Sequence, residues 1–563
     1  MPPPPPRRLP PLATGALFAA LLVGATPAAR TAAEPPSLVV LLAVDQMRAD
    51  YVERYGRHWT AGLRRLLDGG ARFDHAAYPF LNTVTCTGHS TIGTGRFPRR
   101  HGMILNQWWD RGAGRWVACT EDPSVQTVHA GGTIAGGDSA ARMMAPAFAA
   151  RLRANGGRVV GLSLKARSAI TLAGADADAV VWFGGPGTWV TSTAYARELP
   201  PFVLEVLKRH PIEADRRETW TKRLEASAYV GEDAAAGERP PAGWSNVFPH
   251  PLESSSAEQF LERWQVAPIS DSRLVDLALA ALDRYELGRR GRTDFLAVSF
   301  SSLDRVGHAF GPDSHEVQDV LARVDAEIGR LLDQLDARVG RGRYVVALSA
   351  DHGVGPVPEQ AAAKGLDAGR LDPKRVIEAI NTAAAKYLGP ATGSYVAAVA
   401  YTDIYLRPGV WERLRANAEA AGAVVEAIGQ LPGIMRVFRS DELAQLRDDD
   451  PIQRAAALSY FPGRSGDLIV VPKRYWMLSP GAAATHGTLH DYDQQVPVVF
   501  AGAGIRPGRY TTAATPADIA PTLAALLQIQ GDFDGRPLRE ALADAATGAG
   551  AHAGEASRRV PPR

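Results

Sequence analysis

The strongest constraint on the fold is a layout that recurs along the chain, in which a short, wholly apolar run is followed by helix-like sequence. The first run, Leu38–Val44 (LVVLLAV), is apolar throughout and contains β-branched residues, which is typical of a central strand in a parallel sheet. The layout recurs at 295–311, 344–355 and 495–505, and apolar residues at helical spacing lie between, for example at 314–339. Strands that alternate with helices predict an α/β fold with a mostly parallel sheet.

Two long regions interrupt this alternation. The region 195–272 is rich in Pro, Trp and charged residues and has little periodicity, whereas 356–481 has an αβ-like pattern of its own. We interpret both as insertions into one domain that spans 34–543 and includes a predicted helix at 515–529. The Ala-, Gly- and Arg-rich stretch 544–563 predicts a disordered tail.

The first 33 residues have the layout of a signal peptide. Two arginines precede the apolar run 12–23, and small residues follow it. An uncleaved anchor is the alternative, but the run is short for a membrane span and Pro27 follows soon after it. We therefore expect cleavage between Ala28 and Glu34 and a periplasmic or secreted protein. No other stretch of the sequence predicts a membrane span.

Charge and cysteine content restrict the class of partner and the covalent links. The sequence has 62 Lys and Arg against 60 Asp and Glu, whereas nucleic-acid-binding domains carry a concentrated basic excess, so we expect no nucleic-acid partner. The two cysteines, Cys86 and Cys119, fit one disulfide in an oxidising compartment. They fit two buried free thiols equally well.

Candidate metal ligands lie at the ends of the predicted strands. Asp304 and His308 follow one apolar run, and a pair four residues apart on a helical turn faces one point. The full set is Asp45, Asp304, His308, Asp351, His352 and His486. A single Asp–His pair is more often a cap or a surface pair, but six such residues at the edge where α/β sheets bind ligands favour a metal site. Carboxylates and imidazoles suit Zn²⁺, and six are about right for two ions.

The segment 82–95 (NTVTCTGHSTIGTG) supplies candidate nucleophiles. Its small residues suit a strand-to-helix turn, and the N-terminus of a helix favours the negative charge of an alkoxide. The simpler interpretation, a Ser/Thr-rich N-cap, accounts for most of these hydroxyls.

Seven motifs carry a family resemblance. They occur in the order AVDQMRAD (43–50), VTCTGHSTIGTG (84–95), ILNQWWD (104–110), SLKARSAI (163–170), SSLDRVGHAFGP (301–312), SADHGV (349–354) and ATHGT (484–488). In this order the chain resembles the alkaline phosphatase superfamily, and most of all its bacterial threonine-nucleophile members, the PafA-like and Sphingomonas-type enzymes. The resemblance covers most of the chain after the signal peptide. It implies an alkaline-phosphatase-like core, a large central sheet flanked by helices with insertions over the active site.

The resemblance implies a role for each candidate residue. Thr85 would be the nucleophile, form a phosphothreonine and contact one of two Zn²⁺ ions. One ion would be bound by Asp304, His308 and His486, and the other by Asp45, Asp351 and His352. Asn106, Lys165 and Arg167 would bind phosphoryl oxygens.

Lys165 and Arg167 indicate the substrate class. A phosphate monoester arrives as a dianion, whose charged oxygens these two cations match, and diester-specific relatives generally lack the pair. Alternate spacing at a strand end is expected to point both side chains the same way. The expected ligands are therefore small phosphate monoesters. Sulfatase as the main activity is not expected, because Cys86 lacks the Pro and Arg of the C/S-x-P-x-R signature.

Two alternatives to a monoesterase remain at this point. One is a phosphodiesterase or nucleotide pyrophosphatase of the same superfamily, and the other is a catalytically silent surface protein that binds metal or phosphate esters. The resemblance also favours a Cys86–Cys119 disulfide and places His89 behind the metal ligands rather than among them. Neither the natural substrate nor the oligomeric state follows from the sequence.

Overall fold

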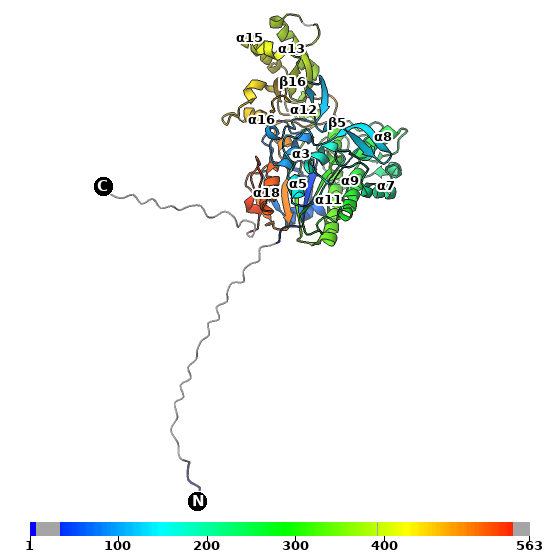
Figure 1. Ribbon diagram of the computed structural model, residues 1–563, viewed down its shortest axis with the longest axis vertical. Coiled ribbons are helices and arrows are strands. Elements are labelled where there is room, and N and C mark those ends of the chain that lie inside the picture. The colour runs from blue at the N-terminus through cyan, green and yellow to red at the C-terminus, as the bar shows by residue number, and fades with distance from the viewer. Residues whose placement is uncertain (7–33, 391, 544–563) are drawn as a thin grey trace, which may run out of the picture.

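One large sheet organises the molecule (Figure 1). The computed structural model describes residues 1–6, 34–390 and 392–543. Among the described residues, eleven strands pair in the order β21-β2-β20-β13-β1-β12-β7-β8-β9-β5-β6. In chain order these are β1 (Leu38–Val44), β2 (Ala71–Phe73), β5 (Glu121–His129), β6 (Gly132–Asp138), β7 (Val159–Ser163), β8 (Ala179–Gly184), β9 (Thr188–Ser192), β12 (Asp294–Phe300), β13 (Tyr344–Ser349), β20 (Val498–Gly502) and β21 (Gly508–Tyr510). The apolar run of the predicted signal peptide and the predicted tail lie outside the described residues.

The centre of the sheet is parallel, as the apolar runs predict. β13, β1, β12, β7 and β8 are consecutive parallel neighbours. All seven residues of β1 are buried, and alternate residues belong to different apolar clusters, Val40 and Leu42 to one and Val39 and Leu41 to the other. A strand whose two faces both pack against helices has no polar face, which explains the continuous apolar run.

The sheet as a whole is mixed, because antiparallel strands are added on both sides of this centre. The run at 495–505 was expected to behave like the other strands, but it forms β20, which pairs antiparallel with β13. Ser349, the last residue of β13, pairs with Val498, the first residue of β20. The chain therefore enters β20 at the same edge of the sheet at which it left β13, and the two strands run in opposite directions.

Helices cover both faces of the sheet. On one face lie α2 (Gly62–Gly69), α9 (Ile269–Arg284) and α11 (His315–Leu335), and on the other α3 (Thr85–Thr94), α5 (Phe148–Ala154), α6 (Ala166–Ala173) and α18 (Ile519–Leu526). α11 agrees with the helix predicted at 314–339, and it begins where the Ser314 side chain accepts a hydrogen bond from the Val317 backbone N–H. None of the described helices is both long and apolar enough to cross a membrane.

The second predicted insertion has a sheet and an apolar core of its own, at the top of the view in Figure 1. Its four-stranded antiparallel sheet has the order β15 (Val396–Ala400), β16 (Asp403–Leu406), β18 (Leu468–Pro472) and β17 (Ile434–Arg439). Helices α13 (Pro373–Leu388) and α15 (Ala418–Gly429) pack on it. The division of the chain into one domain with two insertions stays a prediction.

The first predicted insertion is more regular than its sequence suggests. It contains α7 (Pro201–Arg209) and α8 (Ala257–Val266), joined by 3-10 turns and a short two-stranded pairing. A buried contact ties it to α11, because His250 Nε2 lies 2.8 Å from Glu316 Oε1 and both side chains are fully buried. Burial raises the pKa of Glu316 to about 8 and lowers that of His250 to about 4, so a neutral pair is favoured.

The two cysteines form a disulfide, as the family resemblance implied. Cys86 in the first turn of α3 is bonded to Cys119, which follows the hairpin of β3 (Gln107–Asp110) and β4 (Arg115–Ala118). The Cys119 backbone N–H also donates to the Asn106 carbonyl oxygen at 3.0 Å. The bond therefore fixes the start of α3 to the loop that carries Asn106.

Replacing both Cys86 and Cys119 with Ser is expected to lower the free energy of unfolding by about 2–4 kcal/mol, because the disulfide closes a loop with a sequence separation of 33. Denaturant unfolding with and without reductant measures the effect. Reductant is expected to destabilise the wild type and leave the double variant unchanged. Equal stability of the wild type in both conditions would contradict the prediction.

Candidate active site

The six predicted metal ligands lie together in two groups of three. Asp304, His308 and His486 form the first group, and Asp45, Asp351 and His352 form the second. Within each group the potential ligand atoms lie within 4.8 Å of one another. The two groups have the membership that the family resemblance implied.

Strand ends explain this convergence. Asp45 follows β1 directly, Asp351 and His352 follow β13, and Asp304 lies in the first turn of α10 (Ser302–Phe310), which begins just after β12. His308 is one turn further along α10, with its Nε2 at 3.3 Å from Asp304 Oδ1. Because the three strands are parallel neighbours, all these residues emerge at one edge.

The two groups adjoin through their imidazoles. The rings of His352 and His486 stack with centroids 3.5 Å apart and an interplanar angle of 14°. His486 comes from the loop before β20, and its Nε2 lies 3.6 Å from Asp304 Oδ1. His352 Nε2 lies 3.2 Å from Asp351 Oδ2 and 3.6 Å from Asp45 Oδ1.

All three imidazoles are oriented by backbone carbonyls. His308 Nδ1 lies 2.8 Å from the Ala484 oxygen, His352 Nδ1 lies 2.9 Å from the Gly353 oxygen, and His486 Nδ1 lies 2.9 Å from the Thr83 oxygen. A carbonyl only accepts hydrogen bonds, so each Nδ1 carries a proton, and in the neutral ring Nε2 keeps a lone pair. This is the tautomer that a metal-ligating histidine needs. Burial also lowers the pKa of His486 well below its ordinary value, which keeps that ring neutral.

The carboxylates have the oxygen donors that a divalent metal requires. Asp45 Oδ1 is buried and has no hydrogen-bond partner among the described residues, and buried Asp351 Oδ2 has only imidazole nitrogens near it, His89 Nδ1 at 3.1 Å and His352 Nε2 at 3.2 Å. Burial, with the nearby Asp304 and Asp351, raises the pKa of Asp45 well above its ordinary value. Burial also acts to raise the pKa of Asp304, but Lys165 and His308 outweigh it and hold that pKa well below its ordinary value. The buried carboxylate oxygens and free Nε2 lone pairs form a donor set that fits two divalent cations.

Thr85 lies next to both groups. It is the first residue of α3, it is buried, and its Oγ1 lies 3.4 Å from His352 Nε2. The helix approaches the end of β13 very closely, because a Cβ added at Gly88 would lie 2.0 Å from the Asp351 carbonyl oxygen. Only glycine fits at this crossing.

The other hydroxyls of the segment do not cap the helix, which corrects the expected Ser/Thr N-cap. Val84 is the N-cap residue and makes no side-chain cap bond. Thr91 and Thr94 instead bond the carbonyls of Thr87 and Ser90, one turn back, at 2.9 and 2.6 Å. Hydroxyls inside a helix can make this bond to the preceding turn.

His89 lies behind the ligands, where the resemblance placed it. Its Nδ1 is 3.1 Å from Asp351 Oδ2 and 2.9 Å from the Thr85 carbonyl oxygen, and its Nε2 is 2.8 Å from Ser299 Oγ. The ring therefore links the second group to the backbone of Thr85 and to β12.

Asn106, Lys165 and Arg167 line the same cavity as Thr85, which has a volume of about 440 Å³. Asn106 Oδ1 accepts from the Cys86 backbone N–H at 2.8 Å. Lys165 Nζ donates to Asp45 Oδ2 at 2.6 Å and to Asp304 Oδ2 at 2.5 Å, so it bridges the two groups. Arg167 Nε is buried without a hydrogen-bond partner among the described residues.

The strand alternation expected for Lys165 and Arg167 is wrong, although both reach the cavity. β7 ends at Ser163, Lys165 is the N-cap of α6, and Arg167 lies in the first turn of that helix. A strand-to-helix turn, rather than the pleat of a strand, brings the two side chains together.

Several residues of the cavity wall were not predicted as site residues, among them Arg239, Arg305 and Tyr401. Arg305 lies inside the motif SLDRVGH and could have been noticed there. Arg239 and Tyr401 come from the two insertions, for which the sequence offers no site signal. Tyr401 lies at the tight turn between β15 and β16 with φ of 52°, a left-handed conformation that is unfavourable for tyrosine.

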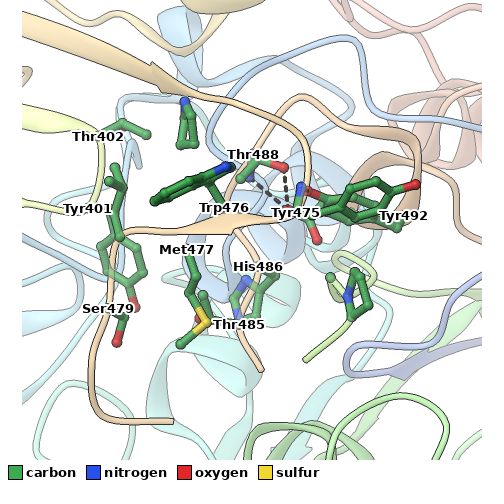
Figure 2. Close-up of a pocket in the computed structure, with 16 residues that line it drawn as sticks. Tyr401, Thr402, Tyr475, Trp476, Met477, Ser479, Thr485, His486, Thr488 and Tyr492 are labelled. Carbon is green, nitrogen blue, oxygen red and sulfur yellow. Dashed lines mark hydrogen bonds between the residues drawn. The ribbon is translucent and has the colours of Figure 1, made fainter. Parts of the chain in front are cut away.

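A second, narrow pocket of about 40 Å³ adjoins the cavity (Figure 2). Tyr401 and His486 line both spaces. Its other walls are largely aromatic or apolar and include Tyr475, Trp476, Met477 and Tyr492. Asp493, which also lines the pocket, accepts from the Thr488 backbone N–H at 2.9 Å and from the Thr488 hydroxyl at 2.6 Å. These bonds fix the loop two residues after His486.

Known proteins share this chain's sequence and architecture. The family model for type I phosphodiesterase / nucleotide pyrophosphatase matches residues 39–493. A protein named calcium-transporting ATPase from Myroides odoratus is 32% identical over 90% of this chain and 95% of its own length. Alkaline phosphatase PafA from Elizabethkingia meningoseptica is 31% identical over 94% of this chain and 98% of its own length.

The fold agrees with these matches. The crystal structure of wild-type alkaline phosphatase PafA superposes with a TM-score of 0.84 at 29% identity, covering 91% of this chain and 100% of that one. The α/β fold with a large sheet flanked by helices is therefore confirmed. The chain belongs to the type I phosphodiesterase / nucleotide pyrophosphatase family, within the alkaline phosphatase superfamily that its motifs indicated.

Proposed function

We propose that this protein is a zinc-dependent alkaline phosphatase that hydrolyses phosphate monoesters through Thr85. One observation carries the proposal: two groups of three ligands adjoin at Thr85, in a cavity also lined by Asn106, Lys165 and Arg167. The similarity to alkaline phosphatase PafA, in sequence and in structure, supports the activity.

The proposed reaction has two displacements at phosphorus. In the first, a bond forms between Thr85 Oγ1 and phosphorus while the bond to the ester oxygen breaks, which releases the alcohol and leaves a phosphothreonine. In the second, water displaces the threonine oxygen, which releases inorganic phosphate and restores Thr85. Two zinc ions, when bound by the two groups, supply Lewis-acid stabilisation of the attacking and leaving oxygens and lower the pKa of water.

The chain's own residues hold the reacting groups in place. Thr85 lies at the N-terminus of α3, where the helix dipole favours a negative oxygen. Asn106 is oriented by its bond from the Cys86 N–H, so its amide N–H groups remain available for a phosphoryl oxygen. Two contacts fix the first turn of α3: the disulfide at Cys86 and the hydrogen bond between His89 Nδ1 and the Thr85 carbonyl oxygen.

Lys165 and Arg167 favour a monoester over a diester. A monoester has two charged non-bridging oxygens beyond those that face the metal groups, and a diester replaces one of them with an organic group. Both side chains line the cavity: Arg167 can meet the dianion with its guanidinium, and Lys165, which donates to Asp45 and Asp304, retains a third N–H for it. The similarity to alkaline phosphatases shows that the chain is a phosphatase enzyme. A phosphodiesterase of the same superfamily is the alternative, and the comparison of monoester with diester turnover below separates the two.

We further propose that the protein is exported by its N-terminal signal peptide and acts in the periplasm or outside the cell.

Thr85→Ala is expected to abolish hydrolysis of 4-nitrophenyl phosphate, and Thr85→Ser to retain part of it, because serine keeps the attacking oxygen. A matched control is Thr91→Ala, since Thr91 bonds the Thr87 carbonyl and does not line the cavity. Steady-state kinetics give the comparison, and mass spectrometry of acid-quenched enzyme detects phosphate on Thr85. Full activity of Thr85→Ala would refute this nucleophile.

Changing Lys165 and Arg167 together to Ala is expected to lower kcat/KM for a monoester by about 100-fold or more, with a smaller loss for a diester. The reason is that only the monoester presents the second charged oxygen. The ratio of 4-nitrophenyl phosphate to bis-4-nitrophenyl phosphate turnover measures this. Dominant diester turnover that survives the double change would favour the phosphodiesterase.

Two zinc ions per chain are expected by metal analysis, and a chelator is expected to remove both metal and activity. His486→Ala should lower the zinc content to about one, since it removes one of three ligands from the first group. His490→Ala is the matched control, because that histidine is also buried but bonds the Pro472 carbonyl. Bound zinc without any hydrolysis at alkaline pH would contradict the proposed function.

A further inference from the structure

We propose that Arg305 and Arg239 form a second anion subsite, which binds a negatively charged group on the alcohol part of the substrate. The inference rests on the proposed monoesterase function and specifies its substrate class. The favoured substrates are monoesters whose leaving alcohol carries a carboxylate or a further phosphate.

Arg305 is a cation that faces the cavity without a carboxylate partner. It follows Asp304 on α10, but its Nη2 donates to the neutral Gln265 Oε1 at 2.8 Å. Its Nε is buried and has no hydrogen-bond partner among the described residues. A buried guanidinium N–H without a partner is costly, so an anion in the cavity would stabilise it.

Arg239, from the first predicted insertion, is a second arginine that lines the cavity and forms no ion pair with a carboxylate among the described residues. Its backbone N–H donates to the Ala309 carbonyl, and its guanidinium donates to the Pro480 carbonyl, so both ends of the residue are held at the cavity mouth. The neighbouring carboxylate of Glu359 is already paired with Arg370 at 2.7 Å. Arg239 therefore retains positive charge toward the cavity that it lines.

The charge of the cavity wall exceeds what the transferred phosphoryl group uses. Arg167 and the third N–H of Lys165, whose other two bond Asp45 and Asp304, are available for the charged oxygens of that group. Arg305 and Arg239 add two further guanidinium groups to the same wall. Apart from Asp304, the only carboxylate among the lining residues described is Glu262, which is exposed. A planar guanidinium matches a carboxylate or phosphate by two parallel hydrogen bonds. The excess charge and the space beyond Thr85 point to an anionic leaving group.

A pair of substrates isolates the effect of the second charge. D-3-phosphoglycerate and sn-glycerol 1-phosphate have the same configuration at C2 and differ by a carboxylate in place of a hydroxymethyl group. The measured quantity is the ratio of their kcat/KM values, phosphoglycerate over glycerol phosphate, with zinc-loaded enzyme at low and high salt.

Arg305→Gln is expected to lower this ratio by about tenfold, because it removes a charge-assisted hydrogen bond to the carboxylate. Arg305→Lys should give an intermediate ratio, since it keeps the charge but loses the planar fork. Arg239→Gln should lower the ratio less, because its side chain is exposed, and Glu262→Gln should raise it. High salt should lower the wild-type ratio.

Other outcomes separate the competing explanations. An equal loss for both substrates in Arg305→Gln would overturn the proposal, because it would place Arg305 on the transferred phosphoryl group. An unchanged ratio in both Arg305→Gln and Arg239→Gln would also overturn it. Thermal unfolding and zinc content check that Arg305→Gln folds, and Arg239→Gln tests the subsite if it does not. Hydrolysis of 4-nitrophenyl phosphate without hydrolysis of phosphoglycerate would overturn the subsite, whereas no hydrolysis of any of the three monoesters would refute the proposed function.

Discussion

The register between β1 and its two parallel neighbours is the constraint on which the site depends. Val44 pairs with Phe300, and Ala43 pairs with both Ser299 and Ser349, so the three strands end level with one another. Their next residues therefore emerge at one edge, where Asp45, Asp304 and Asp351 converge. A shift of one strand by one residue would turn its side chains to the opposite face and separate the carboxylates.

Convergence of three buried carboxylates has an electrostatic cost that the surrounding residues offset. Lys165 bridges two of them, and His89 contacts the third from behind. The imidazoles add neutral donors whose tautomers are set by backbone carbonyls. Such a cluster contributes little to folding and is retained for what it binds, since apolar residues of similar volume would pack there at lower cost. Its buried carboxylate oxygens indicate divalent cations as the compensating charge.

The two insertions and the disulfide define the outer half of the site. Arg239 comes from the first predicted insertion and Tyr401 from the second. The Cys86–Cys119 disulfide links α3 to the end of the β3–β4 hairpin. Tyr401 keeps its unfavourable φ because the paired strands on both sides of the turn impose it. The inner half of the cavity is therefore built from residues at the ends of the central strands, and its outer half includes residues from the regions 195–272 and 356–481.

The sequence by itself determined the elements whose causes are local. Continuous apolar runs predicted β1, β12 and β13, and the Asp and His residues near their ends indicated a metal site, because a strand end and its next few residues form one local pattern. The division of the ligands into two groups, with His486, was implied by the family resemblance. Only the tertiary structure decided the antiparallel direction of β20, the N-cap at Val84, the turn that presents Lys165 and Arg167, and the approach of Arg239 and Tyr401. These features depend on contacts between residues far apart in the chain, such as Gly88 against Asp351 or His486 against Thr83. Local periodicity and capping patterns extend over a few turns of chain, so they carry no information about which distant segments will pack together.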